Sequence, residues 1–242
     1  MKKHWVDAYR QIVPGRGHPH GPLQPVLLVL TVVTGLVDAF SYLTLSHVLV
    51  ANMTGNVVFG GFASAGADGF LWWALLLAVL AFLVGAAFGG VIRRRMGDHR
   101  GRHLFVSSVV EWIVIAAAWA VCLVARSPNT GATLATLVVL LGVAMGVQNA
   151  TARALAVPDL TTTVLTLTIA GIAADASSGH GSRLGRRIVP VIGMFIGALL
   201  GAALVVHGHP AAALGTASLM LAAVAVFMAA GVRSSDEWTS AR

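Results

Sequence analysis

Long apolar stretches alternate with short polar ones along this chain and form eight hydrophobic segments. A helix needs roughly 20 apolar residues to cross the hydrocarbon core of a bilayer. The segments are residues 26–46, 48–66, 70–92, 104–125, 131–153, 159–175, 187–208 and 211–231. The third, fourth, seventh and eighth are ordinary spans, whereas the second and sixth each begin with a polar cluster. The pattern predicts an all-α, polytopic membrane protein.

The composition excludes a soluble globular domain and a disordered chain. Of the 242 residues, 57% are hydrophobic and only 10% are charged, and the mean hydropathy is +0.83. Soluble domains carry about 25% charged residues. We expect a basic cytoplasmic tail over residues 1–25, a single transmembrane domain over 26–231 and a polar tail over 232–242.

Most basic residues lie in the N-terminal tail and in two stretches, residues 93–102 and 183–187. Basic loops favour the cytoplasmic side of a membrane. Three apolar segments separate each basic region from the next, so eight full crossings would place neighbouring regions on opposite sides. Partial or broken crossings by segments 48–66 and 159–175 resolve this conflict. We predict six net crossings with a cytoplasmic N-terminus, anionic lipid headgroups as partners of the basic loops, and no nucleic-acid partner.

A weak internal repeat supports the same arrangement. The stretch VANMTGNVV (50–58) aligns with VPDLTTTVL (157–165), and the same offset places Gly35 on Gly142. Further along, GAAFGG (85–90) resembles GALLGA (197–202). If the halves, about 26–125 and 131–231, enter the membrane from opposite sides, they form the inverted repeat common in transporters. The alternative is a chance similarity between helices rich in Gly, Ala and Val.

An acid inside the first apolar segment, Asp38, is the first candidate for a functional site. A helix places it on the same side as Ser41 and Tyr42. Ionisable groups at membrane depth usually face a bundle interior or a water-filled path. The functional interpretation is a solute or proton path with Asp38 as proton carrier, and the structural one is a buried acid that locks the bundle. Glu111 is a second acid within an apolar segment.

Two polar clusters accompany these acids. Asn52, Thr54 and Asn56 surround Gly55, and a glycine allows a turn or a close approach that other residues resist. Side-chain amides can hold a polar solute or cap the free backbone groups of a broken helix, and both interpretations stay open. The second half contributes further candidates for the same path, namely Gln148, Asn149, Asp159, Thr161 and Thr162.

Patterns of known catalytic and metal sites are absent from the sequence. It contains no HExxH, P-loop, GxSxG or CxxC motif, and Cys122 is its single cysteine. The histidine pairs at 18/20 and 207/209 lie in predicted loops without a carboxylate or cysteine set. We therefore expect no enzymatic activity, no cofactor and no metal.

The motif GLVDAFSYLTL…VANMTGN, followed downstream by GVQNATARALAVPDLTTTVLT, resembles the YoaK-like family of bacterial multi-pass membrane proteins, a domain of unknown function. The resemblance covers roughly residues 26 to 232. It implies a multi-pass protein of the bacterial inner membrane with no assigned activity, and it supplies no catalytic residue. The resemblance also leads us to expect a glycine near positions 46–47, where this chain has Ser46 and His47.

Two functional classes fit these observations. The first is a small-solute transporter or permease with an unknown substrate, in which polar residues of both halves line a central path and Asp38 couples transport to protons. The second is a scaffold, sensor or assembly factor whose polar residues serve helix packing. Assembly with further copies of the chain stays open in both classes.

Overall fold

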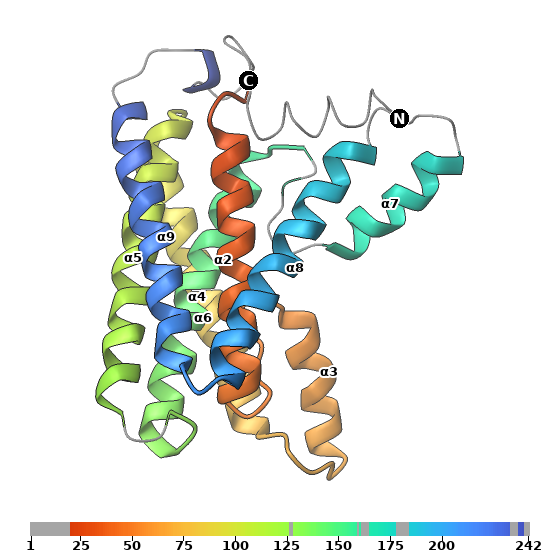
Figure 1. The fold of residues 1–242 in the computed structure, drawn as a ribbon. Helices are drawn as coiled ribbons and strands as arrows, with labels where there is room; N and C mark the ends of the chain where they lie inside the picture. Colours follow the sequence, from red (N-terminus) through yellow and green to blue (C-terminus); the bar gives the residue numbers. More distant parts are fainter. Residues whose placement is uncertain are drawn as a thin grey trace.

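A computed structural model describes residues 20–125, 128–158, 160, 165–177, 184–232 and 237–239. All regular elements in these ranges are helices (Figure 1), as predicted. Their bounds are α2 (Leu23–Thr44), α3 (Met53–Ser64), α4 (Trp72–Met96), α5 (Arg100–Val124), α6 (Gly131–Leu155), α7 (Leu165–Ser177), α8 (Leu184–Val206), α9 (Pro210–Gly231) and the 3-10 helix η2 (Glu237–Thr239).

Six of the helices are long and apolar enough to cross a membrane, and these are α2, α4, α5, α6, α8 and α9. The other two, α3 and α7, have only 12 and 13 residues. They correspond to the segments expected to cross incompletely, so the prediction of six crossings and two partial segments is confirmed. Irregular backbone beside such short helices is tolerated at membrane depth only where protein or a water-filled cavity surrounds it.

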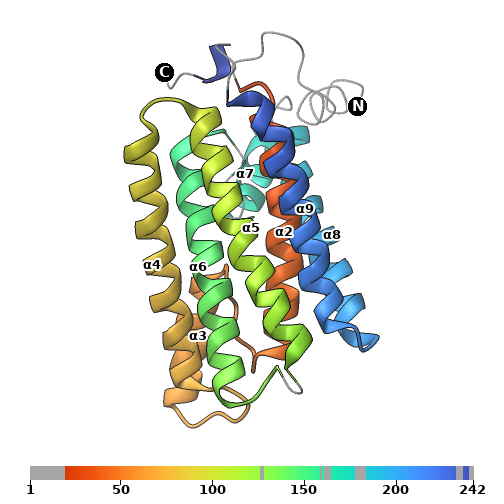
Figure 2. The same ribbon diagram turned by 90° about the vertical axis from the view of Figure 1, so that its left-hand side faces the viewer.

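The long helices form one upright bundle, and the two short helices flank it at opposite ends (Figures 1 and 2). We call one end of the bundle the basic end, because the arginines at the α4–α5 turn lie there together with the start of α2 and the ends of α6 and α9. The opposite end is the far end. Helix α3 lies toward the far end, and α7 lies toward the basic end.

The helix contacts repeat between the two halves of the chain. The two most extensive contacts pair α4 with α6 and α2 with α8, each formed by one helix of each half. The counterparts in the two halves are α2 and α6, α3 and α7, α4 and α8, and α5 and α9. If each helix is replaced by its counterpart, the α4–α6 contact becomes the α8–α2 contact. The same replacement turns α3–α4 into α7–α8 and α5–α6 into α9–α2, and it leaves the α5–α9 contact unchanged. This arrangement is the predicted inverted repeat, with α5 and α9 next to the two-fold axis.

Glycines set the close contacts at equivalent places in both halves. A Cβ on Gly35 of α2 would meet backbone atoms of residues 194 and 198 in α8, and a Cβ on Gly142 of α6 faces backbone atoms of residues 78 and 82 in α4. These contacts support the predicted match of Gly35 with Gly142. The register of α4 against α8 differs from the one that the sequence suggested, however. Gly85 contacts the backbone of residue 143 in α6, and Gly201 contacts the equivalent residue 36 in α2, so Gly85 corresponds to Gly201. The expected match of 85–90 with 197–202 is therefore wrong by one helical turn.

Most of the basic stretch 93–102 is helical, and only residues 97–99 form a turn between α4 and α5. Arg93, Arg94 and Arg95 form the last turn of α4, where basic residues interact favourably with the helix dipole. Arg100 begins α5, and its Nη2 donates a hydrogen bond of 2.6 Å to the carbonyl of Leu155 at the end of α6. The arginines at this end thus also satisfy carbonyl groups that a helix terminus leaves unpaired.

Candidate functional site

The segment between α2 and α3 turns back into the bundle. Its residues Leu45, Val48, Val50 and Ala51 are buried, although a connecting loop normally runs over the surface. The reversal begins at Ser46 and His47, whose φ angles of 52° and 62° lie in the left-handed region that favours glycine. The geometry gives a physical reason for the expected glycine at this point.

Asp38 connects this segment to α2. Its Oδ1 accepts a hydrogen bond of 2.9 Å from the amide of Ala51, and its Oδ2 accepts one of 2.5 Å from Nδ2 of Asn52. The side chain is 5% exposed. A carboxylate with two such donors holds the start of α3 deep inside the protein. We call the Asp38–Ala51–Asn52 arrangement the clasp.

Asn56 completes the support of the turn. Its Nδ2 donates to the carbonyl of Leu49, and its Oδ1 accepts a hydrogen bond of 2.9 Å from the amide of the same residue. Because one side-chain amide satisfies both backbone groups, Asn56 acts as a cap for buried, irregular backbone. At 1% exposure it has no surface to offer a solute. The contacts of this residue are those that the structural interpretation predicts.

A cavity of about 280 Å³ lies beside the clasp. Its walls are made by the start of α3, by α4 and α6, and by the start of α7, so both halves contribute. The lining residues are Ala51, Asn52, Met53, Thr54, Phe82, Asn149 and Thr166. Amide and hydroxyl groups face it together with a thioether and an aromatic ring, and none of the lining side chains is charged.

The chemistry of this cavity suits a small molecule with polar and apolar parts. Ligand sites are typically concave and largely apolar, with a few polar groups that fix orientation. Asn52 connects the cavity to the clasp, because the residue that lines the wall also donates to Asp38. A change in the protonation of Asp38 would therefore reach the cavity through one hydrogen bond.

The structure brings together some of the predicted site residues and separates others. Asn52, Thr54 and Asn149 line the cavity, and Asp38 lies one hydrogen bond away. The predicted residues outside the lining are Ser41, Tyr42, Gly55, Asn56, Gln148 and Glu111. Three further candidates, Asp159, Thr161 and Thr162, lie outside the described residues.

Gln148 connects two long helices instead of lining the cavity. Its Nε2 donates a hydrogen bond of 2.6 Å to Oγ1 of Thr34, so the side chain bridges α6 and α2. Ser41 donates to the backbone carbonyl of Asp38 within its own helix. On the polar face predicted for the first segment, Asp38 and Ser41 are buried and Tyr42 is half-buried, and these side chains have different partners.

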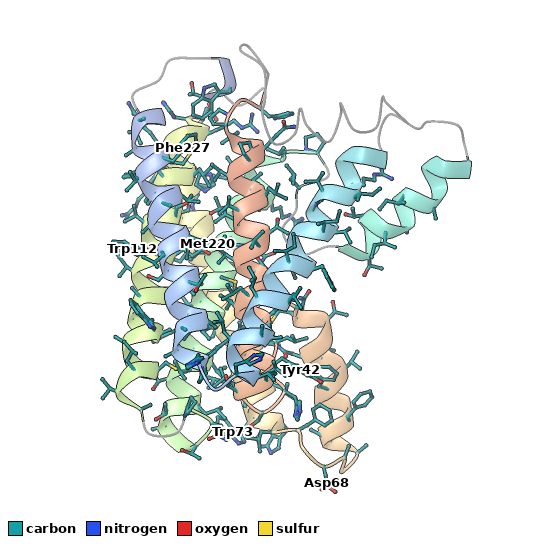
Figure 3. The ribbon with its side chains drawn as sticks, viewed as in Figure 1. Tyr42, Asp68, Trp73, Trp112, Met220 and Phe227 are labelled. Carbon is teal, nitrogen blue, oxygen red and sulfur yellow. The ribbon has the colours of Figure 1, made fainter. Side chains whose placement is uncertain are left out.

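Tyr42 belongs to an aromatic cluster at the far end. Its ring contacts those of His47 and Phe59, and Phe62 and Phe70 extend the cluster toward the α3–α4 connection. Figure 3 shows Tyr42, Asp68 and Trp73 near this end of the bundle, whereas Trp112 and Phe227 lie on the outer side of α5 and α9. With exposures of 38% and 57%, Trp112 and Phe227 belong to an apolar outer surface suited to lipid.

Sequence reasoning missed four residues that line the cavity, namely Ala51, Met53, Phe82 and Thr166. Thr166 follows the predicted Thr162 by four residues, so helical spacing could have indicated it. Met53 and Phe82 carry no such signal, because apolar residues in apolar segments all look alike. No group of three or more metal-ligating side chains occurs in the part of the chain that the structure describes.

Six long apolar helices in two inverted halves, with a polar cavity between them, define a multi-pass helical membrane protein. The model of the family described as "Protein of unknown function (DUF1275)" matches residues 26–227. The chain belongs to this family, and the resemblance seen in the sequence is confirmed.

One relative is the UPF0700 transmembrane protein YoaK of Bacillus subtilis (strain 168). It is 29% identical over 153 residues, which cover 63% of this chain and 66% of that protein. The match therefore spans just under two thirds of the relative's length. No solved structure matches this chain.

Proposed function

We propose that this protein is a transporter that moves a small polar solute across the bacterial cytoplasmic membrane. The observation that supports this proposal most is the cavity between the halves, which the start of α3 and the start of α7 both line. Inverted repeats whose broken helices meet at a central site are a common transporter plan. Rocking one half against the other would expose such a site to each side in turn.

The clasp supplies a means of coupling transport to protons. As a carboxylate, Asp38 accepts hydrogen bonds from both Ala51 and Asn52. Protonation of Oδ2 would replace an acceptor by a donor and release the Asn52 amide toward the cavity. Proton uptake at Asp38 would therefore change the groups that a bound solute meets. The uncharged lining favours a solute that hydrogen-bonds to amides and hydroxyls while its apolar part contacts Met53 and Phe82.

The basic end, where α2 begins, would face the cytoplasm. This orientation follows the bias of basic residues toward the cytoplasmic side, because Arg93, Arg94, Arg95, Arg100 and Arg102 all lie at that end. The exposed members of this group would contact anionic lipid headgroups. No part of the proposal needs a cofactor or a chemical reaction, so we propose that the protein is not an enzyme.

A scaffold or assembly factor is the second candidate. It is favoured by Asn56 and Gln148, two predicted path residues whose hydrogen bonds hold the protein's own helices and loops together. In that case the cavity would be a static gap.

Access to the cavity from the two sides separates the candidates. In a Cys122→Ser background, Thr54→Cys places a thiol in the cavity wall, and Val57→Cys places one on the outer surface of the same helix, where Val57 is 67% exposed. A thiol in hydrocarbon does not ionise and reacts poorly, so Val57→Cys is the matched control.

Each variant, reconstituted in vesicles, is treated with a membrane-impermeant thiol reagent on one face or the other. We expect Thr54→Cys to react from either face and Val57→Cys from neither. Failure of Thr54→Cys to react, or reaction from one face only, would contradict alternating access and favour the static protein.

A further inference from the structure

A second set of buried polar groups lies apart from the cavity. Seven side-chain atoms within the described residues are buried without any hydrogen-bond partner. They are Gln24 Oε1 on α2, His103 Nε2, Ser107 Oγ, Ser108 Oγ and Glu111 Oε1 on α5, and Gln148 Oε1 and Thr151 Oγ1 on α6. Leaving one such atom unpaired costs about 1–3 kcal/mol, so buried polar groups nearly always have a partner, which is often an ordered water.

The three hydroxyl groups in this set, on Ser107, Ser108 and Thr151, lack the hydrogen bond that hydroxyl groups on α2 make. On α2, Thr31, Thr34 and Thr44 each donate to the carbonyl four residues earlier, at 2.6–2.9 Å. This internal bond is available to any serine or threonine in a helix. Ser107 and Thr151 do not make it.

The unpaired atoms follow one another from the basic end to the middle of the bundle. Gln24 is one residue from the start of α2, Thr151 is four from the end of α6, and Ser107 is seven from the start of α5. Glu111 is eleven residues into α5, at a depth of roughly 16 Å for a rise of 1.5 Å per residue. No unpaired buried atom among the described residues lies closer to the far end.

Between Glu111 and the far end of the bundle, the same face of α5 is apolar. His103, Ser107 and Glu111 are spaced by four residues, and the buried residues that continue this face are Ile115, Ala118 and Cys122. A row of polar groups that begins near one end of the bundle and stops at an acid has the form of a one-sided path. An ionised carboxylate at this depth is unstable unless water, a proton or a cation compensates its charge.

We propose that this face of α5, together with α6 and the start of α2, lines a water-filled path from the basic end to Glu111. Through it, the Glu111 carboxyl exchanges its proton with the solution at that end alone. On uptake an O–H bond forms at the carboxylate and its negative charge disappears, and on release the proton returns along the same waters. The ligands are water and protons. The proposal does not depend on solute transport.

Few other charged groups surround Glu111. Helix α9 has no titratable residue within Pro210–Gly231, and α6 contributes only Arg153, which is exposed near its end. Helix α4 contributes Arg93, Arg94 and Arg95 at the basic end. On α5 itself the groups are Arg100, Arg102 and His103, and η2 carries Glu237 beyond them. Basic groups therefore gather at the mouth of the path, and Glu111 is the acid at its base.

The first test measures water along the path. In a Cys122→Ser background, Ser107→Cys replaces one polar wall residue by a group of similar size, and Ala118→Cys is its control on the same face below Glu111. A small, charged thiol reagent is added at the basic end. We expect Ser107→Cys to react at least about tenfold faster, which corresponds to about 1.4 kcal/mol in accessibility. Equal rates would overturn the proposal.

The second test observes the carboxyl group itself. Infrared difference spectra of the reconstituted protein between acid and alkaline pH should contain a buried carboxylic acid band that disappears in Glu111→Gln and remains in Asp38→Asn. A band of Asp38→Asn that persists when Glu111→Gln is added, or an Asp38→Asn spectrum without such a band, would contradict proton exchange at Glu111, because Asp38 contributes to neither spectrum. Loss of the band on adding Na⁺ or K⁺ at constant pH would also overturn the proposal, because it would identify a cation site. Neither test uses the cavity, so their results are separate from those for transport.

Discussion

The clasp makes a quantitative prediction about the pair Asp38 and Asn52. Asp38→Asn keeps an acceptor for the Ala51 amide but turns an NH₂ group toward the NH₂ of Asn52, so the bond of 2.5 Å is lost. Hydrogen bonds to charged groups contribute about 1.5–3 kcal/mol, and bonds between membrane helices average about 0.6 and reach about 1.7 kcal/mol. We expect Asp38→Asn to destabilise the folded protein by about 1–2 kcal/mol.

A double variant in which the side chains of positions 38 and 52 are exchanged provides the control. In Asp38→Asn with Asn52→Asp, the new amide at position 38 can donate to the new carboxylate at position 52, and its oxygen still accepts from Ala51. Unfolding of the four proteins in detergent, followed by tryptophan fluorescence against denaturant, gives the coupling energy of a double-mutant cycle. We expect the exchange to recover about 1 kcal/mol relative to the sum of the single changes. A coupling below about 0.3–0.5 kcal/mol, the range within which independent sites add, would refute the clasp.

Three further changes test the fold. Gly85→Ala places a Cβ on the backbone of α6 and should destabilise by about 1–3 kcal/mol in thermal unfolding, whereas Gly90→Ala, which meets nothing within 4 Å, should have no such effect. Ser46→Gly removes a left-handed non-glycine residue and should stabilise by about 1–2 kcal/mol; a lower melting temperature would contradict the assigned turn. Arg100→Ala removes the donor to the α6 terminus and should destabilise by about 1–3 kcal/mol, with the exposed Arg94→Ala near neutral in the same assay.

The short helices could be predicted because a membrane leaves few structural options. Segments 48–66 and 159–175 combined insufficient regular apolar length with polar residues, and loop charge favoured six crossings over eight. Helix ends were less predictable. Arg93–Arg95 were assigned to a loop, yet they continue α4, because a long basic side chain can extend to water from the last turn of a helix.

The candidate site was predicted only in part, because its residues have alternatives that the sequence does not distinguish. Asn52 and Asn56 carry the same side chain four residues apart. The first lines the cavity, whereas the second hydrogen-bonds to the backbone of Leu49 and to Sδ of Met53. Which amide faces a cavity depends on where the turn at Ser46 and His47 directs the chain, and that direction is a property of the folded backbone.

The sequence by itself determined the membrane class and the number of long helices, because hydrophobic length and loop charge are local properties that a bilayer converts directly into topology. The inverted relation of the halves was one of two interpretations of a weak repeat, and the helix contacts decided it. Only the tertiary structure decided which polar groups meet. It joined Asp38 to Asn52 across 14 positions of the chain, Gln148 to Thr34 across 114, and left Glu111 at the end of a row of unpaired atoms. Those relations arise from helix packing, where glycines fix how closely and in which register the backbones approach.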